Sequence, residues 1–199
     1  MRVYIVRHGD KEKDNYYNSD LRHQDPPLSE EGRQKAKKLL DYFKGKHINR
    51  IIVSEYLRTE QTAQYVAESK GLAVIKDRRL NEIDNGVIES MTDEDIKKKY
   101  PEFWKDFFSY SKDVRFPEGE TGEEVRARQK ALLYELIKNN EDVLLVSHEG
   151  YIRLLVCNLL DVPVYKRNLF KVDMCGIMEL KYDKKIESWV IVKFNHTLD

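Results

Sequence analysis

Cysteine is scarce in this chain of 199 residues, which contains only Cys157 and Cys175. Two cysteines are too few for a disulfide framework, and this pair lacks the close spacing of metal ligands. Both residues are therefore interpreted as free thiols.

The chain also lacks a net charge and a long apolar run. Lysine plus arginine and aspartate plus glutamate number 35 each, so no overall field attracts the protein to nucleic acid or to an anionic lipid surface. No stretch approaches the roughly 18 apolar residues of a membrane span, and the apolar run after Met1 is too short for a signal peptide. We therefore expect a cytoplasmic protein without nucleic-acid or membrane partners, whose oligomeric state stays open.

What the sequence does contain is a globular composition, with 35% charged and 41% hydrophobic residues. Short β-rich runs alternate with helical patterns, which predicts a three-layer α/β fold with a mostly parallel central sheet and helices on both faces. The predicted strands are Val3–Val6, Asn49–Ser54, Asp142–Ser147, Gly176–Tyr182 and Ile186–Phe194. The predicted helices follow Ser29, Thr92 and Thr121 or span Leu57–Lys70 and Glu149–Leu160. Because no repeat or linker interrupts the pattern, residues 1–199 are predicted to form one domain, with a helical and aromatic excursion at about 92–117.

Two of these strands end in a histidine: V-Y-I-V-R-H-G contains Arg7 and His8, and V-L-L-V-S-H-E-G contains His148. A third strand ends at Ser54, and Arg58 lies one turn into the next helix. Ligands of open α/β sheets bind beyond the carboxyl ends of the strands. These residues are therefore predicted to share one site, in which the two histidines can face each other. The remaining histidines stand in polar contexts and are interpreted as surface residues: His23, His47 and His196.

The residue types at this edge suit phosphoryl transfer. The guanidinium forks of Arg7 and Arg58 match phosphate oxygens, helix N-termini add N–H donors, and a neutral histidine can attack phosphorus. Positive charge around the phosphate would stabilise the transition state, so this chemistry requires no metal and no cofactor. A carboxyl group beside a dianionic phosphate is kept protonated by like charge, which suits a donor to the leaving oxygen. The candidates in the Leu80–Glu89 loop are Glu82, Asp84 and Glu89.

Five sequence elements, in order along nearly the whole chain, resemble those of the histidine phosphatase superfamily, also called phosphoglycerate mutase-like. They are R-H-G at Arg7–Gly9, P-L-S-E-E-G-R-Q-K-A at Pro27–Ala36, S-E-Y-L-R-T-E-Q-T-A at Ser54–Ala63, G-E-T at Gly119–Thr121 and S-H-E-G-Y-I-R at Ser147–Arg153. In the second element the glutamine and alanine are slightly displaced from the family spacing. The resemblance implies a phosphoglycerate mutase-like fold with His8 as the phosphohistidine nucleophile. It further implies that the phosphate pocket is formed by Arg7, Arg58 and His148. Glu82 is then the proton donor.

Within the superfamily, the segment Leu80–Ile96 resembles the loop of the fructose-2,6-bisphosphatase domain. Glu118 and Glu149 stand where that domain has a lysine and a glutamine, and both acids would repel a second phosphate. Lys11 stands where many members have a threonine near the phosphate, and it is a candidate to donate to a phosphate oxygen instead. Lys11, Ser54 and Glu149 are therefore included among the candidate substrate-binding residues.

The predicted function is that of a metal-independent, histidine-type acid phosphatase that hydrolyses a small phosphomonoester, with a sugar phosphate as the leading substrate. One alternative is phosphoglycerate mutase chemistry, in which the phosphohistidine returns its group to another hydroxyl. The short 89–118 stretch lacks the longer insertion of cofactor-dependent mutases. The other alternative is a phosphate-sensing or phosphoprotein-binding module without turnover. The absence of a G-x-x-x-x-G-K-[ST] loop excludes a bisphosphatase coupled to its kinase in this chain and leaves a stand-alone bisphosphatase as an open alternative.

Overall fold

The computed structural model describes residues 1–21 and 23–198. Its main sheet has six strands in the order β5-β4-β6-β1-β7-β8. Their bounds are Arg2–Arg7 (β1), Arg50–Val53 (β4), Val74–Lys76 (β5), Val143–Ser147 (β6), Ile177–Asp183 (β7) and Ser188–His196 (β8). The strands β5, β4, β6 and β1 pair in parallel, whereas β7 and β8 are antiparallel to their neighbours. The predicted mostly parallel central sheet is confirmed.

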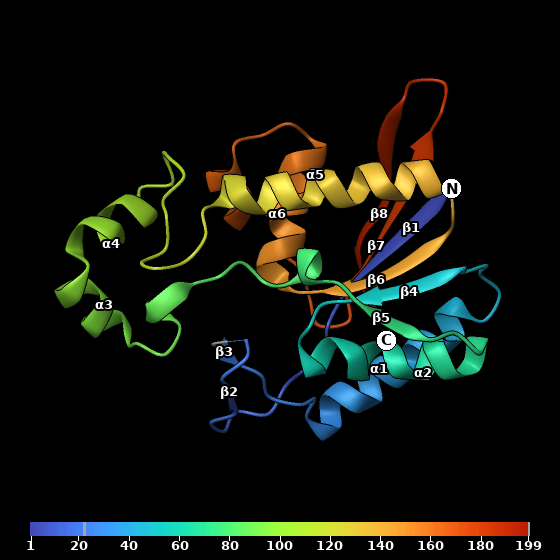
Figure 1. Ribbon diagram of the computed structural model, residues 1–199, viewed down its shortest axis with the longest axis horizontal. Coiled ribbons are helices and arrows are strands. Elements are labelled where there is room, and N and C mark those ends of the chain that lie inside the picture. The colour runs from blue at the N-terminus through green and yellow to red at the C-terminus, as the bar shows by residue number, and fades with distance from the viewer. Residues whose placement is uncertain (22, 199) are drawn as a thin grey trace.

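Two pairs of helices cover the two faces of this sheet (Figure 1). The helices α1 (Glu30–Phe43) and α2 (Leu57–Lys70) lie on one face, and α5 (Gly122–Asn139) and α6 (Glu149–Leu159) lie on the other. Successive strand side chains point to opposite faces, so Tyr4 and Val6 belong to the core under α1 and α2, whereas Val3 and Ile5 belong to the core under α5 and α6. The chain therefore forms three layers around two apolar cores.

The helix boundaries follow local signals in the sequence. The Ser29 hydroxyl accepts the Gly32 N–H at the start of α1, and Thr121 forms a reciprocal capping box with Glu124 at the start of α5. At the end of α2, Gly71 adopts the left-handed conformation that a helix stop favours. The predicted helix starts after Ser29 and Thr121 and the predicted helix end at Lys70 are confirmed.

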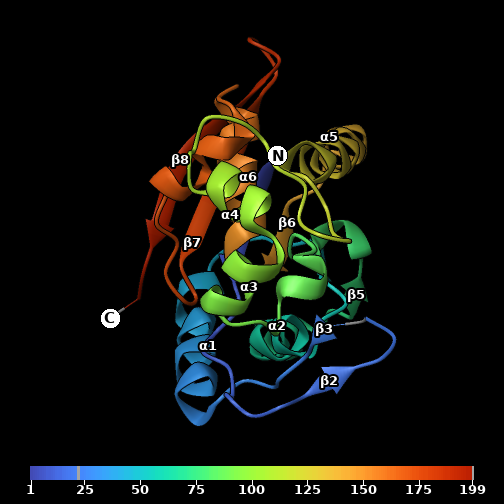
Figure 2. The same ribbon diagram turned by 90° about the vertical axis from the view of Figure 1, so that its left-hand side faces the viewer.

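Short elements occupy the connections between the sheet strands. They are the hairpin of β2 (Tyr17–Asn18) and β3 (His23–Gln24), the helices α3 (Asp93–Lys99) and α4 (Pro101–Phe107), and the 3-10 turns η1 (Arg78–Leu80), η2 (Gly86–Ile88) and η3 (Val164–Leu169). The hairpin and the α3–α4 segment both stand at the end of the molecule toward which the parallel strands run (Figures 1 and 2). Phe103 and Phe107 stack with ring centres 5.4 Å apart, and both contact Phe116. Packing therefore accounts for aromatic residues in this excursion.

Two details of the strand prediction are wrong. The edge strand β5 has no predicted counterpart, because its three residues are partly or largely exposed and carry no alternating pattern. The last strand begins at Ser188, since Ile186 lies in the turn before it and is 66% exposed. Cys157 and Cys175 are free thiols, as predicted, and both are buried. Within the described residues, no helix is both long and apolar enough to cross a membrane.

Candidate active site

The site begins where β1 and β6 end side by side in the sheet. Arg7 lies opposite Ser147 in the parallel register, and the His8 N–H donates to the Ser147 carbonyl at 2.9 Å. The chain therefore delivers His8 and His148 at one sheet edge, with ring centres 5.2 Å apart. Both side chains are buried, with 5% and 0% exposure. Histidines that are 140 residues apart in sequence become neighbours because their strands pair.

The His8 ring is held in one tautomer. Its Nδ1 lies 2.7 Å from the Gly9 carbonyl oxygen, and because a carbonyl only accepts, Nδ1 carries the proton. The neutral ring then keeps its lone pair on Nε2. Burial and the nearby Arg58 guanidinium lower the pKa of His8 well below its usual value of 6.5. The ring is therefore neutral at pH 7, and Nε2 is able to act as a nucleophile.

Glycine follows His8 because two backbones meet closely at this point. A Cβ on Gly9 would lie 2.8 Å from the Gly32 carbonyl oxygen, and a Cβ on Gly32 would lie 2.0 Å from that of Asp10. The loop after β1 thus packs on the first turn of α1, which explains the glycines of R-H-G and P-L-S-E-E-G. The Thr62 hydroxyl adds support, since it accepts the Gly9 N–H at 3.0 Å and donates to the Arg58 carbonyl at 2.7 Å.

His148 has the opposite tautomer. Its Nδ1 lies 3.2 Å from Arg58 Nη2, and because a guanidinium only donates, the neutral ring carries its proton on Nε2. This Nε2–H donates to Ser54 Oγ at 2.8 Å, and the chain of hydroxyls continues to Thr59 at 2.9 Å and the Tyr56 carbonyl at 2.7 Å. Ser54 is fully buried. Its hydroxyl therefore contacts the His148 ring and fixes its orientation.

Two buried neutral imidazoles should make the fold sensitive to acid. The pKa of His148, like that of His8, is lowered well below 6.5, by burial first and by Arg58 next. Below pH 6.5 the unfolded chain therefore binds up to two protons that the folded protein does not. We expect the unfolding free energy to fall with decreasing pH, by at most about 2.7 kcal/mol per pH unit for two groups, until the folded histidines titrate.

Urea unfolding between pH 7.5 and 5.5 measures this slope. His8→Ala should reduce it by about half, because one of the two protons is then missing. Replacing the exposed His196 with alanine is the control. An unfolding free energy with the same slope in wild type and His8→Ala would contradict the prediction.

Arg58 supplies a buried positive charge beside both histidines. The residue is only 6% exposed, and its guanidinium packs 4.3 Å from the centre of the Tyr56 ring. Its Nη1 lies 3.5 Å from the Gln24 carbonyl and 3.7 Å from Asp25 Oδ1. The Nε atoms of Arg58 and Arg7 are buried without a hydrogen-bond partner among the described residues. Because buried donors are costly to leave unpaired, such groups favour the binding of an anion.

Glu149, at the start of α6, lies between two arginines. Its carboxylate oxygens are 3.0 Å from Arg7 Nη2 and 2.5 Å from Arg153 Nη2. Arg7 also donates through Nη1 to the Val172 carbonyl at 2.6 Å. Glu149 therefore does not present the free negative charge that the sequence suggested would repel a second phosphate. Its contacts orient the Arg7 side chain.

Lys11 stands at the mouth of the site. Its backbone forms a β-bridge with Leu28, and the residue is exposed. Partial desolvation and the charge of Arg58 lower the pKa of Lys11, whereas Glu89 and Glu82 act in the opposite direction. These electrostatic partners place its ammonium group close to the predicted site. Donation from Lys11 to a phosphate oxygen stays a prediction.

Glu82 is anchored at the N-terminus of α6, the helix that follows His148. Its carboxylate accepts the N–H groups of Gly150 at 3.1 Å, Tyr151 at 2.8 Å and Ile83 at 2.9 Å. These three donors fix the orientation of the carboxylate. A Cβ on Gly150 would lie 2.7 Å from Glu82 Oε1, so glycine leaves the space that the carboxylate occupies. The structure thus holds Glu82 at the first turn of α6, the helix whose N-cap is His148.

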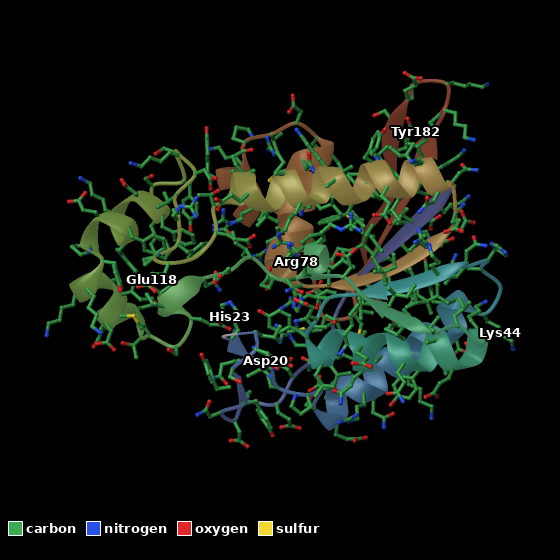
Figure 3. The ribbon with its side chains drawn as sticks, viewed as in Figure 1. Asp20, His23, Lys44, Arg78, Glu118 and Tyr182 are labelled. Atoms are coloured by element: carbon green, nitrogen blue, oxygen red, sulfur yellow. The ribbon has the colours of Figure 1, made fainter. Side chains whose placement is uncertain are left out.

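Two cavities, of about 440 and 450 Å³, border the loop that carries Glu82, and among the described residues neither lining includes Arg7, His8, Arg58 or His148. His23 and Asp84 line both of them, and Glu82 lines the second. The lining of the first includes no lysine or arginine among the described residues. Its carboxylates come from Asp84, Glu89 and Glu118. Figure 3 shows His23 and Glu118 on the same side of the molecule. A group that enters the first cavity therefore meets mainly negative charge.

His23 is the histidine that sequence reasoning misplaced. Its side chain is only 12% exposed, with Nε2 3.1 Å from Asp84 Oδ1 and Nδ1 paired with Glu89. These pairs connect the β2–β3 hairpin to the loop that carries Glu82. The polar neighbours of His23 in the sequence gave no sign of Glu89, which is 66 residues away. The other two histidines interpreted as surface residues, His47 and His196, are exposed.

The chain is similar to known proteins over nearly its whole length. Phosphoserine phosphatase 1 of Hydrogenobacter thermophilus is 34% identical over 202 residues, which cover 99% of this chain and 93% of that protein. A probable phosphoglycerate mutase GpmB of an Enterobacter species is 33% identical over 205 residues, which cover 96% and 91%. The structure of a mycobacterial glucosyl-3-phosphoglycerate phosphatase with VO3 has a TM-score of 0.79 and 25% identity, covering 98% of this chain and 99% of that one.

The similarity to the fructose-2,6-bisphosphatase domain is limited to the segment Leu80–Ile96 and does not assign the chain to that branch. The family assignment rests on the chain as a whole, because the model of the histidine phosphatase superfamily (branch 1) matches residues 3–197. Together with the two relatives above 30% identity, this match shows that the chain belongs to the histidine phosphatase superfamily.

Proposed function

We propose that the protein hydrolyses a small phosphomonoester through a phosphohistidine on His8. The observation that carries the proposal is the state of the His8 ring, which is neutral, protonated at Nδ1 by its bond to Gly9 and placed beside His148 and Arg58. Membership of the superfamily and the phosphatases among the relatives support it.

In the first step, the Nε2 lone pair of His8 attacks phosphorus while the bond to the leaving oxygen breaks. Arg58 and Arg7 balance the charge on the phosphoryl oxygens, Lys11 adds a donor, and His148 orients Arg58 by accepting from its Nη2. The proton of Glu82 passes to the leaving oxygen, which departs as an alcohol. The His8 ring then carries the phosphoryl group on Nε2 and keeps its proton on Nδ1.

In the second step, a water molecule attacks the phosphohistidine. The Glu82 carboxylate accepts one water proton as the new P–O bond forms, and the P–N bond breaks with return of the electron pair to His8 Nε2. Phosphate leaves, the ring is neutral again, and Glu82 is ready to donate. The N–H groups of Gly150 and Tyr151 hold the Glu82 carboxyl group in place in both steps.

The positive charge in this mechanism comes from the side chains of the protein. Arg7, Arg58 and Lys11 surround the proposed position of the phosphoryl group, so no step requires a metal ion. Within residues 1–21 and 23–198, no group of three or more histidine, cysteine or acidic side chains has an arrangement suited to holding a metal.

The cavity lined by Asp84, Glu89 and Glu118 suggests the class of leaving group. A neutral polyhydroxyl group or a group with an ammonium ion suits this lining, whereas a second phosphate is repelled. A sugar monophosphate therefore remains the leading substrate. Phosphoserine, which carries an ammonium group, is a second compound to test because one relative is named a phosphoserine phosphatase.

Glu118 offers a direct test of this charge selection. It is exposed, and no ion pair engages it among the described residues. We expect Glu118→Lys to raise kcat/KM for fructose 1,6-bisphosphate relative to fructose 6-phosphate by about 10-fold, because reversing one charge near the second phosphate is worth about 1 to 2 kcal/mol at the surface. Glu118→Gln should give a smaller increase. An unchanged ratio of the two kcat/KM values in both variants would contradict the selection.

Phosphoglycerate mutase activity is the second candidate, because relatives about a third identical are named probable mutases. A phosphoglycerate carries a carboxylate in its leaving portion, and the acidic cavity disfavours it. Hydrolysis is therefore the favoured reaction.

The proposal is tested by incubating the protein with a panel of phosphomonoesters and 3-phosphoglycerate in the presence of a chelator. The release of phosphate, the formation of 2-phosphoglycerate and the amount of acid-labile phosphoenzyme are followed together. We expect phosphate release that the chelator does not affect and a transient phosphoenzyme. Loss of turnover with chelator would overturn the metal-free mechanism. Isomerisation without phosphate release would identify a mutase.

A further inference from the structure

The G-E-T motif has a second role besides starting α5. Thr121 forms the helix cap, but Glu120 points away from the cap to Arg128, two turns further along the same helix. The Glu120 carboxylate is 3.0 Å from Arg128 Nη2 and 3.1 Å from its Nε. This paired, two-point contact holds the guanidinium in a fixed orientation.

The fixed guanidinium donates to the backbone of the loop that carries Glu82. Arg128 Nη1 donates to the Arg79 carbonyl at 2.7 Å, and Nη2 donates to the carbonyl of Glu82 itself at 3.1 Å. Arg128 therefore joins both ends of the short 79–82 turn to α5. Its guanidinium also lies 5.4 Å from the ring centre of Tyr151, whose N–H binds the Glu82 carboxylate.

Glu120 holds the continuation of the same loop. Its Oε2 accepts the Asp84 N–H at 3.0 Å, and its own N–H donates to the Asp84 carbonyl at 2.9 Å. The two segments touch backbone to backbone, since a Cβ on Gly119 would lie 2.2 Å from the Asp84 carbonyl oxygen. A Cβ on Gly86, which has φ of +57°, would lie 2.0 Å from the Pro117 carbonyl oxygen. Only glycine permits this contact at either position.

From these contacts we infer that Glu120 and Arg128, here named the Glu120–Arg128 clamp, are positioning residues that aim Glu82 at the leaving oxygen. The clamp fixes the main chain of Glu82 from α5, while the first turn of α6 fixes its carboxylate. Because proton donation falls steeply when the donor moves by a fraction of an ångström, a carboxyl group on a loop needs such support. This inference rests on the proposed role of Glu82.

The test compares leaving groups that differ in their need for a proton. p-Nitrophenolate leaves without protonation, whereas the alkoxide of benzyl phosphate requires it. The measured quantity is kcat/KM for each ester, which reports the formation of the phosphoenzyme. Wild type, Glu82→Gln, Arg128→Gln and Glu120→Gln are compared with Arg126→Gln. Arg126 is the matched control because it lies on α5 with 14% exposure, against 16% for Arg128, and donates instead to the Val162 carbonyl.

We expect Glu82→Gln and Arg128→Gln to reduce kcat/KM for benzyl phosphate by about 10- to 100-fold more than for p-nitrophenyl phosphate. Glu120→Gln should also reduce kcat/KM more for benzyl phosphate than for p-nitrophenyl phosphate, but the difference should be smaller, since its amide oxygen still accepts the Asp84 N–H. Arg126→Gln should change kcat/KM by the same factor for both esters. The double variant Glu82→Gln/Arg128→Gln should be no worse for the benzyl ester than Glu82→Gln, because a donor that is absent cannot be misplaced.

The outcomes separate the two proposals. The effect of Glu82→Gln on kcat/KM can depend on the leaving group while Arg128→Gln lowers kcat/KM equally for both esters. In that case the clamp is only structural and the inference is overturned. If Glu82→Gln itself shows no dependence, the assignment of Glu82 as proton donor fails, and the clamp fails with it. Should Arg128→Gln not fold, the same comparison with Glu120→Gln decides, because that variant keeps the shape of the side chain and one acceptor oxygen while it loses the second acceptor for Arg128.

Discussion

Replacing His8 with alanine should reduce kcat for any phosphomonoester by about 1,000-fold or more, since no other group in the site can carry the phosphoryl group. The acid-labile phosphoenzyme should disappear completely. His148 cannot take over, because its Nδ1 accepts from Arg58 and its Nε2 is bonded to Ser54. Rapid acid quench with a labelled substrate measures the phosphoenzyme, and phosphate release measures turnover.

The control for this variant is His47→Ala, which removes an exposed histidine away from the site. His47→Ala should retain both turnover and phosphoenzyme. Thermal melting of His8→Ala shows whether the fold is intact. Full activity in a folded His8→Ala protein would overturn the nucleophile assignment.

Replacing Arg58 with methionine should have the second largest effect. The side chain fills a similar buried volume but removes the cation next to both histidines. We expect kcat/KM to fall by about 100- to 1,000-fold, because a preorganised charge at the phosphoryl group is lost. The inhibition constant of inorganic phosphate should rise together with this loss, since phosphate reports the ground-state part of the same interaction.

Arg58→Lys is the matched variant, because it keeps the charge but loses the planar fork that bonds to His148. It should fall between wild type and Arg58→Met in both kcat/KM and phosphate inhibition. Equal phosphate inhibition constants in wild type and Arg58→Met would contradict a phosphate-binding role for this residue.

The order of strands and helices could largely be predicted from the sequence. The apolar runs of β1, β4 and β6 are buried on both faces, and such runs are recognisable without any knowledge of their partners. The helix caps at Ser29 and Thr121 are local as well, because donor and acceptor lie within four residues. The edge strand β5 escaped prediction because its pairing with β4, rather than its composition, makes it a strand.

Part of the site could be predicted for the same reason. A residue at the end of a buried parallel strand faces the crevice, so Arg7, His8 and His148 were predictable from their positions. The roles of Ser54 and Glu149 were not, because each depends on one distant partner. Ser54 bonds to His148, which is 94 residues away in the sequence. Glu149, which follows β6, pairs with Arg7 at the end of β1.

By itself, the sequence determined the fold class, the edge of the sheet at which the candidate site lies and the residue types gathered there. Periodicity, strand ends and ordered motifs are local properties, which can be recognised from the sequence alone. Only the tertiary structure decided which nitrogen of His8 is free, which arginine neutralises Glu149 and what holds Glu82 in place. Hydrogen bonds and desolvation depend on atoms that folding brings together from distant parts of the chain, so no reading of one segment could supply them.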